Sequence, residues 1–131
     1  MNENTYSSIK STFDASNAGT IHFGQVISQL VSAGVESYHV DYRSGRTTYY
    51  MADGATYDFR FEKPKHGIAP TFDESAIKAA ILGAQQGSVM YPEFKLLSQS
   101  AGCSAYTVWI SGRHVVYLGR CGETHIEHFP K

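Results

Sequence analysis

The feature that most constrains the fold is a repeat inside the chain. When residues 8–42 are moved along by 68 positions, they meet a similar segment without a gap. Ser32-Ala33-Gly34 then falls on Ser100-Ala101-Gly102, and Tyr38 falls on Tyr106. A long fixed period of this kind is typical of a repeated supersecondary unit that cannot bury its apolar face alone. The chain is therefore predicted to consist of two similar halves.

The two halves are expected at about 5–62 and 73–130, joined by a linker at 63–72 that contains two prolines and a glycine. Residues 1–131 then form a single domain, which is the default for a chain of this length. After one deletion the similarity resumes with Tyr50 on Tyr117. The alignment thus predicts that the second half is one residue shorter at the preceding turn.

Each half reads as two helices followed by three strands. The first helices end before Gly19 and Gly87, because a glycine just past the last apolar position is a common helix stop. The second helices are expected at 22–33 and 91–101. The segments that follow alternate apolar and polar residues with a period of two, and short glycine turns separate them. This pattern predicts a meander of antiparallel strands in each half.

The predicted fold class is α+β. It comprises an internal duplication of a helix-helix-three-strand unit, with antiparallel meanders, helices packed on them and a pseudo-twofold relation between the halves. One continuous six-stranded sheet and two facing three-stranded sheets both satisfy the short loops. We favour the continuous sheet with the helices on one side.

Composition argues against several classes of protein. With 42% hydrophobic residues and a formal net charge of -1, the chain is a folded globule without the basic stripe of a nucleic-acid binder. No apolar run approaches the roughly 18 residues of a membrane span, and the N-terminus lacks a secretory pattern, so the cytoplasm is the expected location. Cys103 and Cys121 are then expected to be free thiols, and their pairing stays open.

Several segments resemble a known family. They are Tyr91-Pro92-Glu93-Phe94, Ala101-Gly102-Cys103, Gly112-Arg113-His114-Val115-Val116-Tyr117, and the C-terminal run Gly119-Arg120-Cys121-Gly122-Glu123 into His125-Ile126-Glu127-His128-Phe129-Pro130. The pattern is similar to the small bacterial and prophage-encoded YbcV/YdfO-like family of unknown function, often labelled "phage envelope protein". The similarity covers nearly the whole chain. It implies the fold and a prophage-type origin, with a partner among host or phage proteins, but no reaction.

The C-terminal strand carries the best candidates for chemistry. Glu123, His125 and Glu127 would share one strand face at spacings of about 6–7 Å. They could form part of a metal site or an acid and base pair, with His128 or Cys121 as a further member. The same row would also protect a solvent-facing edge strand from mispairing, and this interpretation is favoured. No metal site and no cofactor are predicted, because the chain lacks a closely spaced helical ligand pair.

A second candidate site is a sheet face rich in large aromatic side chains, which favour contact with proteins. Trp109 follows Val108 on an alternating strand, so Trp109 is exposed or at an interface if Val108 points to the core. His39 and Asp41, which are expected on one face of another strand, could line a groove. The candidate binding residues are Trp109, Tyr49, Tyr57, His39 and Asp41, with Tyr117 as a further aromatic member.

These observations predict a non-catalytic protein-interaction module that binds another protein or forms a homodimer, with no nucleic-acid or membrane partner. The alternative is a metal-binding protein or an enzyme that uses the C-terminal Glu/His row. A structural phage component is the third class. Convergence of the Glu/His side chains in a concavity would favour the enzyme, whereas a flat aromatic patch would favour the interaction module.

Overall fold

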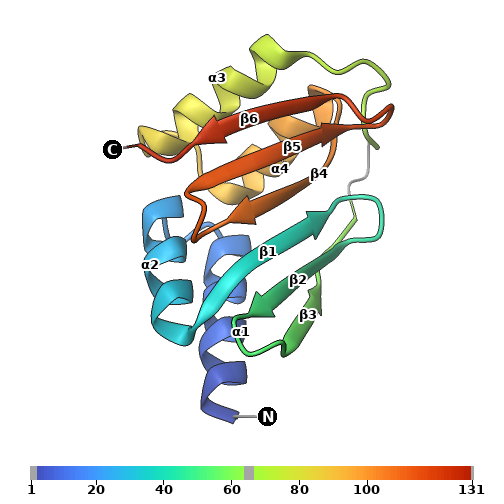
Figure 1. Ribbon diagram of the computed structural model, residues 1–131. Coiled ribbons are helices and arrows are strands. Elements are labelled where there is room, and N and C mark those ends of the chain that lie inside the picture. The colour runs from blue at the N-terminus through green and yellow to red at the C-terminus, as the bar shows by residue number, and fades with distance from the viewer. Residues whose placement is uncertain (1–2, 64–66, 131) are drawn as a thin grey trace.

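The computed structural model describes residues 3–63 and 67–130. Two helices followed by three strands occur twice along the chain (Figure 1). The elements are α1 (Glu3–Asn17), α2 (Phe23–Ala33), β1 (Val35–Asp41), β2 (Arg46–Met51), β3 (Thr56–Arg60), α3 (Glu74–Gln85), α4 (Tyr91–Ser100), β4 (Cys103–Trp109), β5 (His114–Gly119) and β6 (Thr124–His128). The predicted α+β class is confirmed. Duplication as the origin of this order stays a prediction.

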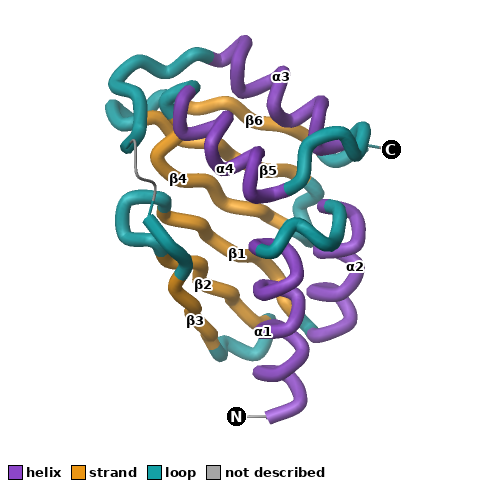
Figure 2. Tube along the Cα trace, turned by 180° about the vertical axis from the view of Figure 1, so that it is seen from behind, coloured by secondary structure: helices purple, strands orange, loops and turns teal. Residues whose placement is uncertain are grey.

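The strands form one six-stranded sheet in the order β3-β2-β1-β4-β5-β6, and every neighbouring pair is antiparallel. The favoured alternative, a continuous sheet with the helices on one side, is therefore correct (Figure 2). The two units meet where β1 pairs with β4. There His39 lies opposite Thr107, 68 positions further along, and the two side chains are hydrogen-bonded at 2.7 Å. The pairing of β1 with β4 is thus symmetric about His39 and Thr107, with equivalent residues of the two units at equal distances on either side.

The strand register corrects the alignment of the two halves. Tyr49 lies opposite Tyr38, and Tyr117 lies opposite Tyr106, so Tyr49 rather than Tyr50 corresponds to Tyr117. The reason is that the two turns have equal length and need no deletion, because each hairpin closes on pairs 68 positions apart. Neighbouring residues in a strand face opposite sides of the sheet, so the one-residue error reverses the predicted side.

The core lies between the helices and the inner sheet face, and it includes Tyr38, Val40, Val108 and Leu30. Tyr49, Tyr57 and Tyr117 also belong to it, with exposed fractions of 4%, 6% and 6%. The prediction that these tyrosines face outward is wrong. Residues directly opposite one another in antiparallel strands share a face, and pairing places Tyr49 between buried Tyr38 and Tyr57.

The start of α3 is fastened to the end of α4. Asp73 is the N-cap, and its carboxylate accepts a hydrogen bond from the backbone N–H of Ala76 at 3.1 Å. The backbone N–H of Asp73 donates to the carbonyl of Ala101 at 2.7 Å. Of the predicted linker 63–72, residues 64–66 lie outside the described part. This attachment positions the first turn of α3 against β6.

Candidate functional site

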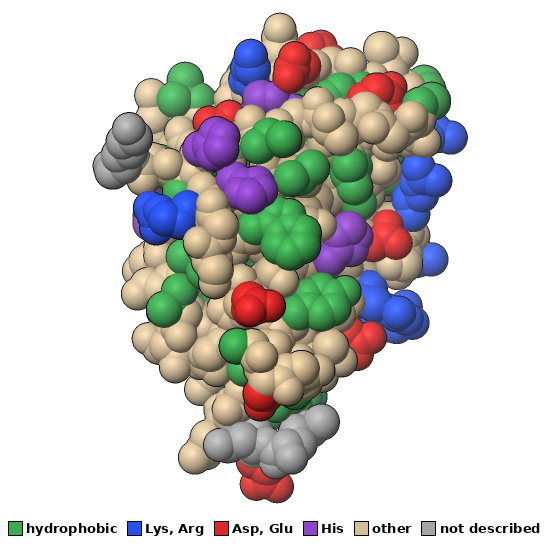
Figure 3. Space-filling view, in the orientation of Figure 1, with side chains coloured by type: hydrophobic (Ala, Val, Ile, Leu, Met, Phe, Trp, Pro, Cys, Tyr) green, Lys and Arg blue, Asp and Glu red, His purple; other side chains and the backbone are tan. Residues whose placement is uncertain are grey.

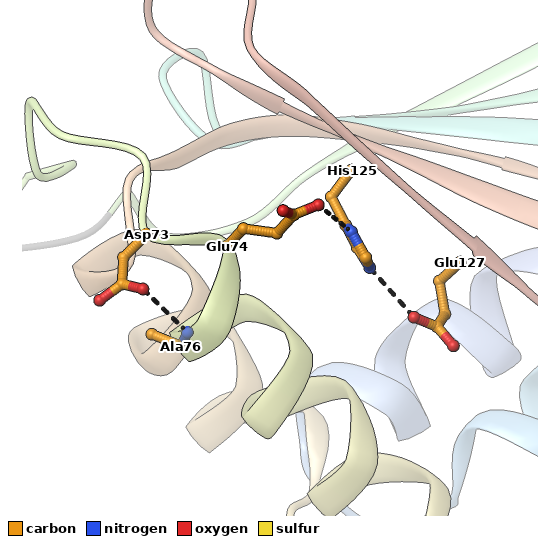
Figure 4. A network of polar contacts seen from close by, with 5 residues as sticks. All are labelled: Asp73, Glu74, Ala76, His125 and Glu127. Carbon is orange, nitrogen blue, oxygen red and sulfur yellow. Dashed lines mark hydrogen bonds and ion pairs between the residues drawn. The ribbon is translucent and has the colours of Figure 1, made fainter.

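A network of two carboxylates and one imidazole joins α3 to β6 (Figure 4). Nδ1 of His125 lies 2.7 Å from Oε2 of Glu74, and Nε2 of the same ring lies 3.0 Å from Oε1 of Glu127. The exposed fraction of the His125 side chain is 7%, whereas those of Glu74 and Glu127 are 52% and 34%. Tyr117 stacks on the ring at a centroid distance of 6.3 Å. The imidazole is therefore enclosed while its partners reach towards solvent.

Both ring nitrogens of His125 face carboxylate oxygens. An ionised carboxylate only accepts hydrogen bonds, and only the doubly protonated imidazole carries a hydrogen on each nitrogen. The geometry therefore fits an imidazolium held between two carboxylates. The hydrogen bond from His125 is also the main reason why the pKa of Glu74 is lowered. An imidazolium in this position has no lone pair available to act as a general base.

The predicted C-terminal row is only partly assembled. His125 and Glu127 share a face, but that face points towards α3, so the favoured solvent-facing interpretation is wrong for these two residues. The pattern alone does not show which side of an edge strand a helix covers. Glu123 lies outside the network, since its Oε1 accepts from the backbone N–H of Cys121 at 2.9 Å within the turn. The predicted row does not include Glu74, which reaches His125 from the first turn of α3.

Equivalent positions in the first unit hold aromatic rings instead of charges. Counting 68 positions back from Glu74, His125 and Glu127 leads to Tyr6, Tyr57 and Phe59. The ring of Tyr6 lies 6.2 Å from that of Tyr57 and 5.4 Å from that of Phe59. The same bridge between first helix and edge strand is therefore apolar in one unit and ionic in the other. This is the clearest chemical difference between the two units.

A cavity of about 90 Å³ lies between the helices and the inner sheet face. Its walls are mainly aromatic and aliphatic, and include Tyr38, Tyr49, Tyr117 and Phe94. Glu127 also lines it, so the carboxylate next to His125 connects the ionic network to this space. The exposed residues of its lining are His22, Gln85, His128 and Pro130. The cavity therefore opens where the two helix-connecting loops meet the C-terminal segment.

Among the described residues, no helix covers the opposite face of the sheet (Figures 1 and 2). Trp109 is exposed there, with an exposed fraction of 45%, while Val108 is buried, as the alternation predicts. On β5, His114 lies directly opposite Trp109, and on β6 His128 lies opposite His114. On the other side, Ser37 of β1 lies opposite Trp109, and Tyr50 of β2 lies opposite Ser37. We call Tyr50, Trp109, His114 and His128 the aromatic row.

Hydrophobic and histidine side chains gather in the middle of this open face, whereas many of the basic side chains lie along one margin (Figure 3). Ile126 adds to the apolar surface with an exposed fraction of 52%. His39 lies on the same side, and burial lowers its pKa, although the charge of Asp41 acts in the opposite direction. Asp41 itself accepts a hydrogen bond from the backbone N–H of Arg43 at 3.0 Å. His39 and Asp41, the two polar candidates for binding, therefore already form hydrogen bonds with neighbouring residues of the protein.

Residues that could take part in metal binding are dispersed. Within 3–63 and 67–130, no group of three His, Cys, Asp or Glu side chains is arranged to hold a metal ion. Cys103 is buried, Cys121 is exposed, and both are free thiols. His128 belongs to the opposite side of β6 from His125 along the alternating strand. Among the described residues, no helix is long and apolar enough to cross a membrane.

Comparison with known proteins places this arrangement in a family. Residues 13–127, which include both β6 members of the ionic network, match the family described as "Protein of unknown function (DUF1398)". The chain belongs to this family. A 65-residue segment of this DUF1398 protein is 32% identical to "Uncharacterized protein Mb2035" of Mycobacterium bovis and to "Uncharacterized protein Rv2012" of Mycobacterium tuberculosis. The match covers 48% of the DUF1398 chain but only 40% of each relative, so it spans less than half of their length.

Proposed function

We propose that this protein is a non-catalytic binding module that contacts a protein partner through the open face of its sheet. The observation that supports the proposal is the aromatic row, in which exposed Trp109 lies between Ser37 and His114 on the neighbouring strands. Tryptophan and tyrosine are enriched among residues that dominate binding energy, and charged residues are depleted at the centres of interfaces. The partner belongs to the bacterial host or to a phage, as the family resemblance implies.

The chemistry of the row indicates what kind of surface it fits. Trp109 and Ile126 offer apolar area, with exposed fractions of 45% and 52%. His114 and His128 stand side by side with ring centroids 5.8 Å apart, and they can donate or accept hydrogen bonds at the rim. A complementary partner surface therefore has an apolar centre with polar groups at one end.

The ionic network favours binding over catalysis. A general base needs a nitrogen or oxygen that is free to take a proton from the substrate. In His125 both nitrogens are used in hydrogen bonds to Glu74 and Glu127. This network therefore supports a structural and electrostatic role for the imidazole.

The proposal is tested by affinity capture from the native host lysate with the tagged protein, followed by mass spectrometry and by titration of the captured partner. Trp109→Ala is expected to weaken the complex by about 30-fold or more, as for a central tryptophan in an interface. Leu96→Ala is the matched control, because Leu96 is similarly exposed, at 55%, but lies on α4.

If the partner is a second copy of the protein, light scattering of the purified protein will show a homodimer. Trp109→Ala should then convert the dimer to a monomer. The proposal fails if Trp109→Ala and Leu96→Ala bind the partner equally well. It also fails if the wild-type protein captures no partner and remains a monomer. A loss of binding confined to His125→Gln would instead favour the ionic network as the functional centre.

A further inference from the structure

The cavity behind the sheet contains buried hydroxyl groups that the protein itself does not use. Tyr38, Tyr49 and Tyr117 line it, with exposed fractions of 6%, 4% and 6%. Within the described part of the chain, none of these three hydroxyls has a hydrogen-bond partner, whereas the Tyr106 hydroxyl donates to that of Tyr91 at 2.6 Å. Buried polar groups are nearly always hydrogen-bonded, so three unpartnered hydroxyls around one cavity require an explanation.

The three hydroxyls remain accessible from the cavity. Among the described residues, Arg46 Nε is the side-chain polar atom that is fully buried and lacks a hydrogen-bond partner, although it lies 3.5 Å from Oδ2 of Asp58. The tyrosine oxygens are therefore not sealed within packed side chains. Burial raises the pKa of all three phenols, so they stay protonated and can both donate and accept. A molecule in the cavity would meet hydrogen-bonding groups as well as aromatic faces.

The charge of the lining selects among possible ligands. Glu127 is the one Asp, Glu, Lys or Arg side chain in the described lining. Its Oε1 accepts from His125, and a carboxylate has further lone pairs through which it can accept another hydrogen bond. An anionic ligand would find no Lys or Arg partner there, whereas aromatic faces attract cations. The two carboxylates around one imidazolium leave the ionic network with one net negative charge, so the lining favours a protonated nitrogen over an anion.

We propose that this cavity binds a small organic amine, with its apolar body against the tyrosine and phenylalanine rings and its protonated nitrogen directed to Glu127 and the free tyrosine hydroxyls. The volume of about 90 Å³ is several times the 10–15 Å³ that one water needs. This proposal goes beyond the protein contact at the open face, since the cavity lies on the helix side of the sheet and shares only His128, at the end of β6, with the aromatic row.

The ionic network has a defined part in this binding. The two carboxylates on His125 are chemically alike, but only Glu127 lines the cavity. The hydrogen bond from Nε2 of His125 holds the Glu127 carboxylate at the wall, while Glu74 supports the same ring from outside. Glu127 is thus assigned to the ligand and Glu74 to the position of His125.

The test compares three aromatic probes of similar size and different charge: benzylamine, benzyl alcohol and benzoate. Dissociation constants are measured by ligand-observed NMR, with the thermal shift of the full-length protein as a second readout. Benzylamine is expected to bind about tenfold more tightly than benzyl alcohol because of one charge-assisted hydrogen bond, and benzoate is expected to bind most weakly.

Matched variants locate the site. Glu127→Gln and Tyr117→Phe are expected to weaken benzylamine binding by about tenfold or less. Tyr57→Phe is the control, because Tyr57 is another buried tyrosine that does not line the cavity. Circular dichroism verifies that each variant is folded. If Glu127→Gln does not fold, the comparison of benzylamine affinity between Tyr117→Phe and Tyr57→Phe tests whether the cavity is the binding site.

Selective binding of benzylamine that is lost in the lining variants would support the proposal. Three outcomes would overturn it: no binding of any probe, binding of benzoate as tight as that of benzylamine, or equal benzylamine affinity in the lining variants and in Tyr57→Phe.

Discussion

Replacement of Gly102 by alanine is expected to destabilise the protein far more than the same replacement at Gly34. The two glycines occupy equivalent positions after α2 and α4, and both have left-handed backbone conformations, with φ of 93° and 89°. Their surroundings differ. A Cβ at Gly102 would lie 2.2 Å from the carbonyl oxygen of Thr71 and 2.8 Å from Cα of Phe72, whereas at Gly34 the nearest atom is the flexible Met51 Cε at 3.4 Å.

The magnitudes follow from these contacts. A left-handed alanine costs about 1–2 kcal/mol, partly offset by about 0.4–1 kcal/mol from the less flexible unfolded chain. Gly34→Ala should therefore cost about 1 kcal/mol in free energy of unfolding. Gly102→Ala adds the cost of forcing backbone apart, about 1–3 kcal/mol, so its total should reach about 2–4 kcal/mol.

Urea unfolding followed by circular dichroism measures both values. The segment that the new Cβ would push leads directly into Asp73 and Glu74, so Gly102→Ala should also disturb the hydrogen bond from His125 to Glu74. NMR chemical shifts of the His125 ring would report that change. Equal destabilisation by Gly34→Ala and Gly102→Ala would refute the reasoning, because it would mean that the backbone at residues 71 and 72 yields without cost.

Two further predictions concern titratable groups. Because the folded-state pKa of Glu74 is lowered, its contribution to stability is present above its unfolded pKa and is lost as pH falls through the folded pKa. The stability difference between wild type and Glu74→Gln should therefore shrink on acidification, and a difference in urea midpoint that is independent of pH would contradict this. Burial raises the pKa of Cys103 to about 12, whereas Cys121 is exposed. A thiol reagent at neutral pH should label Cys121 first, as mapped by mass spectrometry, and equal labelling rates in the native protein would be inconsistent with the buried thiol.

The fold could be predicted from the sequence because its signals are local. Helix-ending glycines, strands with a period of two and short turns each determine an element without reference to the rest of the chain. The element order and the continuous sheet follow from them. Register does not, because a gap placed one residue away changes the face of every side chain in a strand. Tyr50 is therefore aligned with Tyr117 in the sequence, although Tyr49 occupies the equivalent place in the sheet.

The candidate site was only partly predictable because its members come from distant elements. His125 and Glu127 share β6, so the alternation of one strand identifies them as neighbours. Glu74 reaches the same ring from α3, 51 positions away, and no local pattern signals that contact. The cavity has no sequence signature either, since its walls are ordinary core residues. What marks it is the absence of hydrogen-bond partners for Tyr38, Tyr49 and Tyr117 among the described residues, which only coordinates can reveal.

The ionic bridge is difficult to explain by stability alone. The first unit closes the same gap between helix and edge strand with Tyr6, Tyr57 and Phe59, so the fold does not require charges there. Replacing a buried ionic group by well-packed apolar side chains is often neutral or stabilising. His125, held between two carboxylates at an exposed fraction of 7%, therefore offers the fold little that an aromatic ring would not. What the ionic version adds is a carboxylate in the wall of an aromatic cavity. A ligand for Glu127 accounts for the difference between the units, whereas fold stability does not.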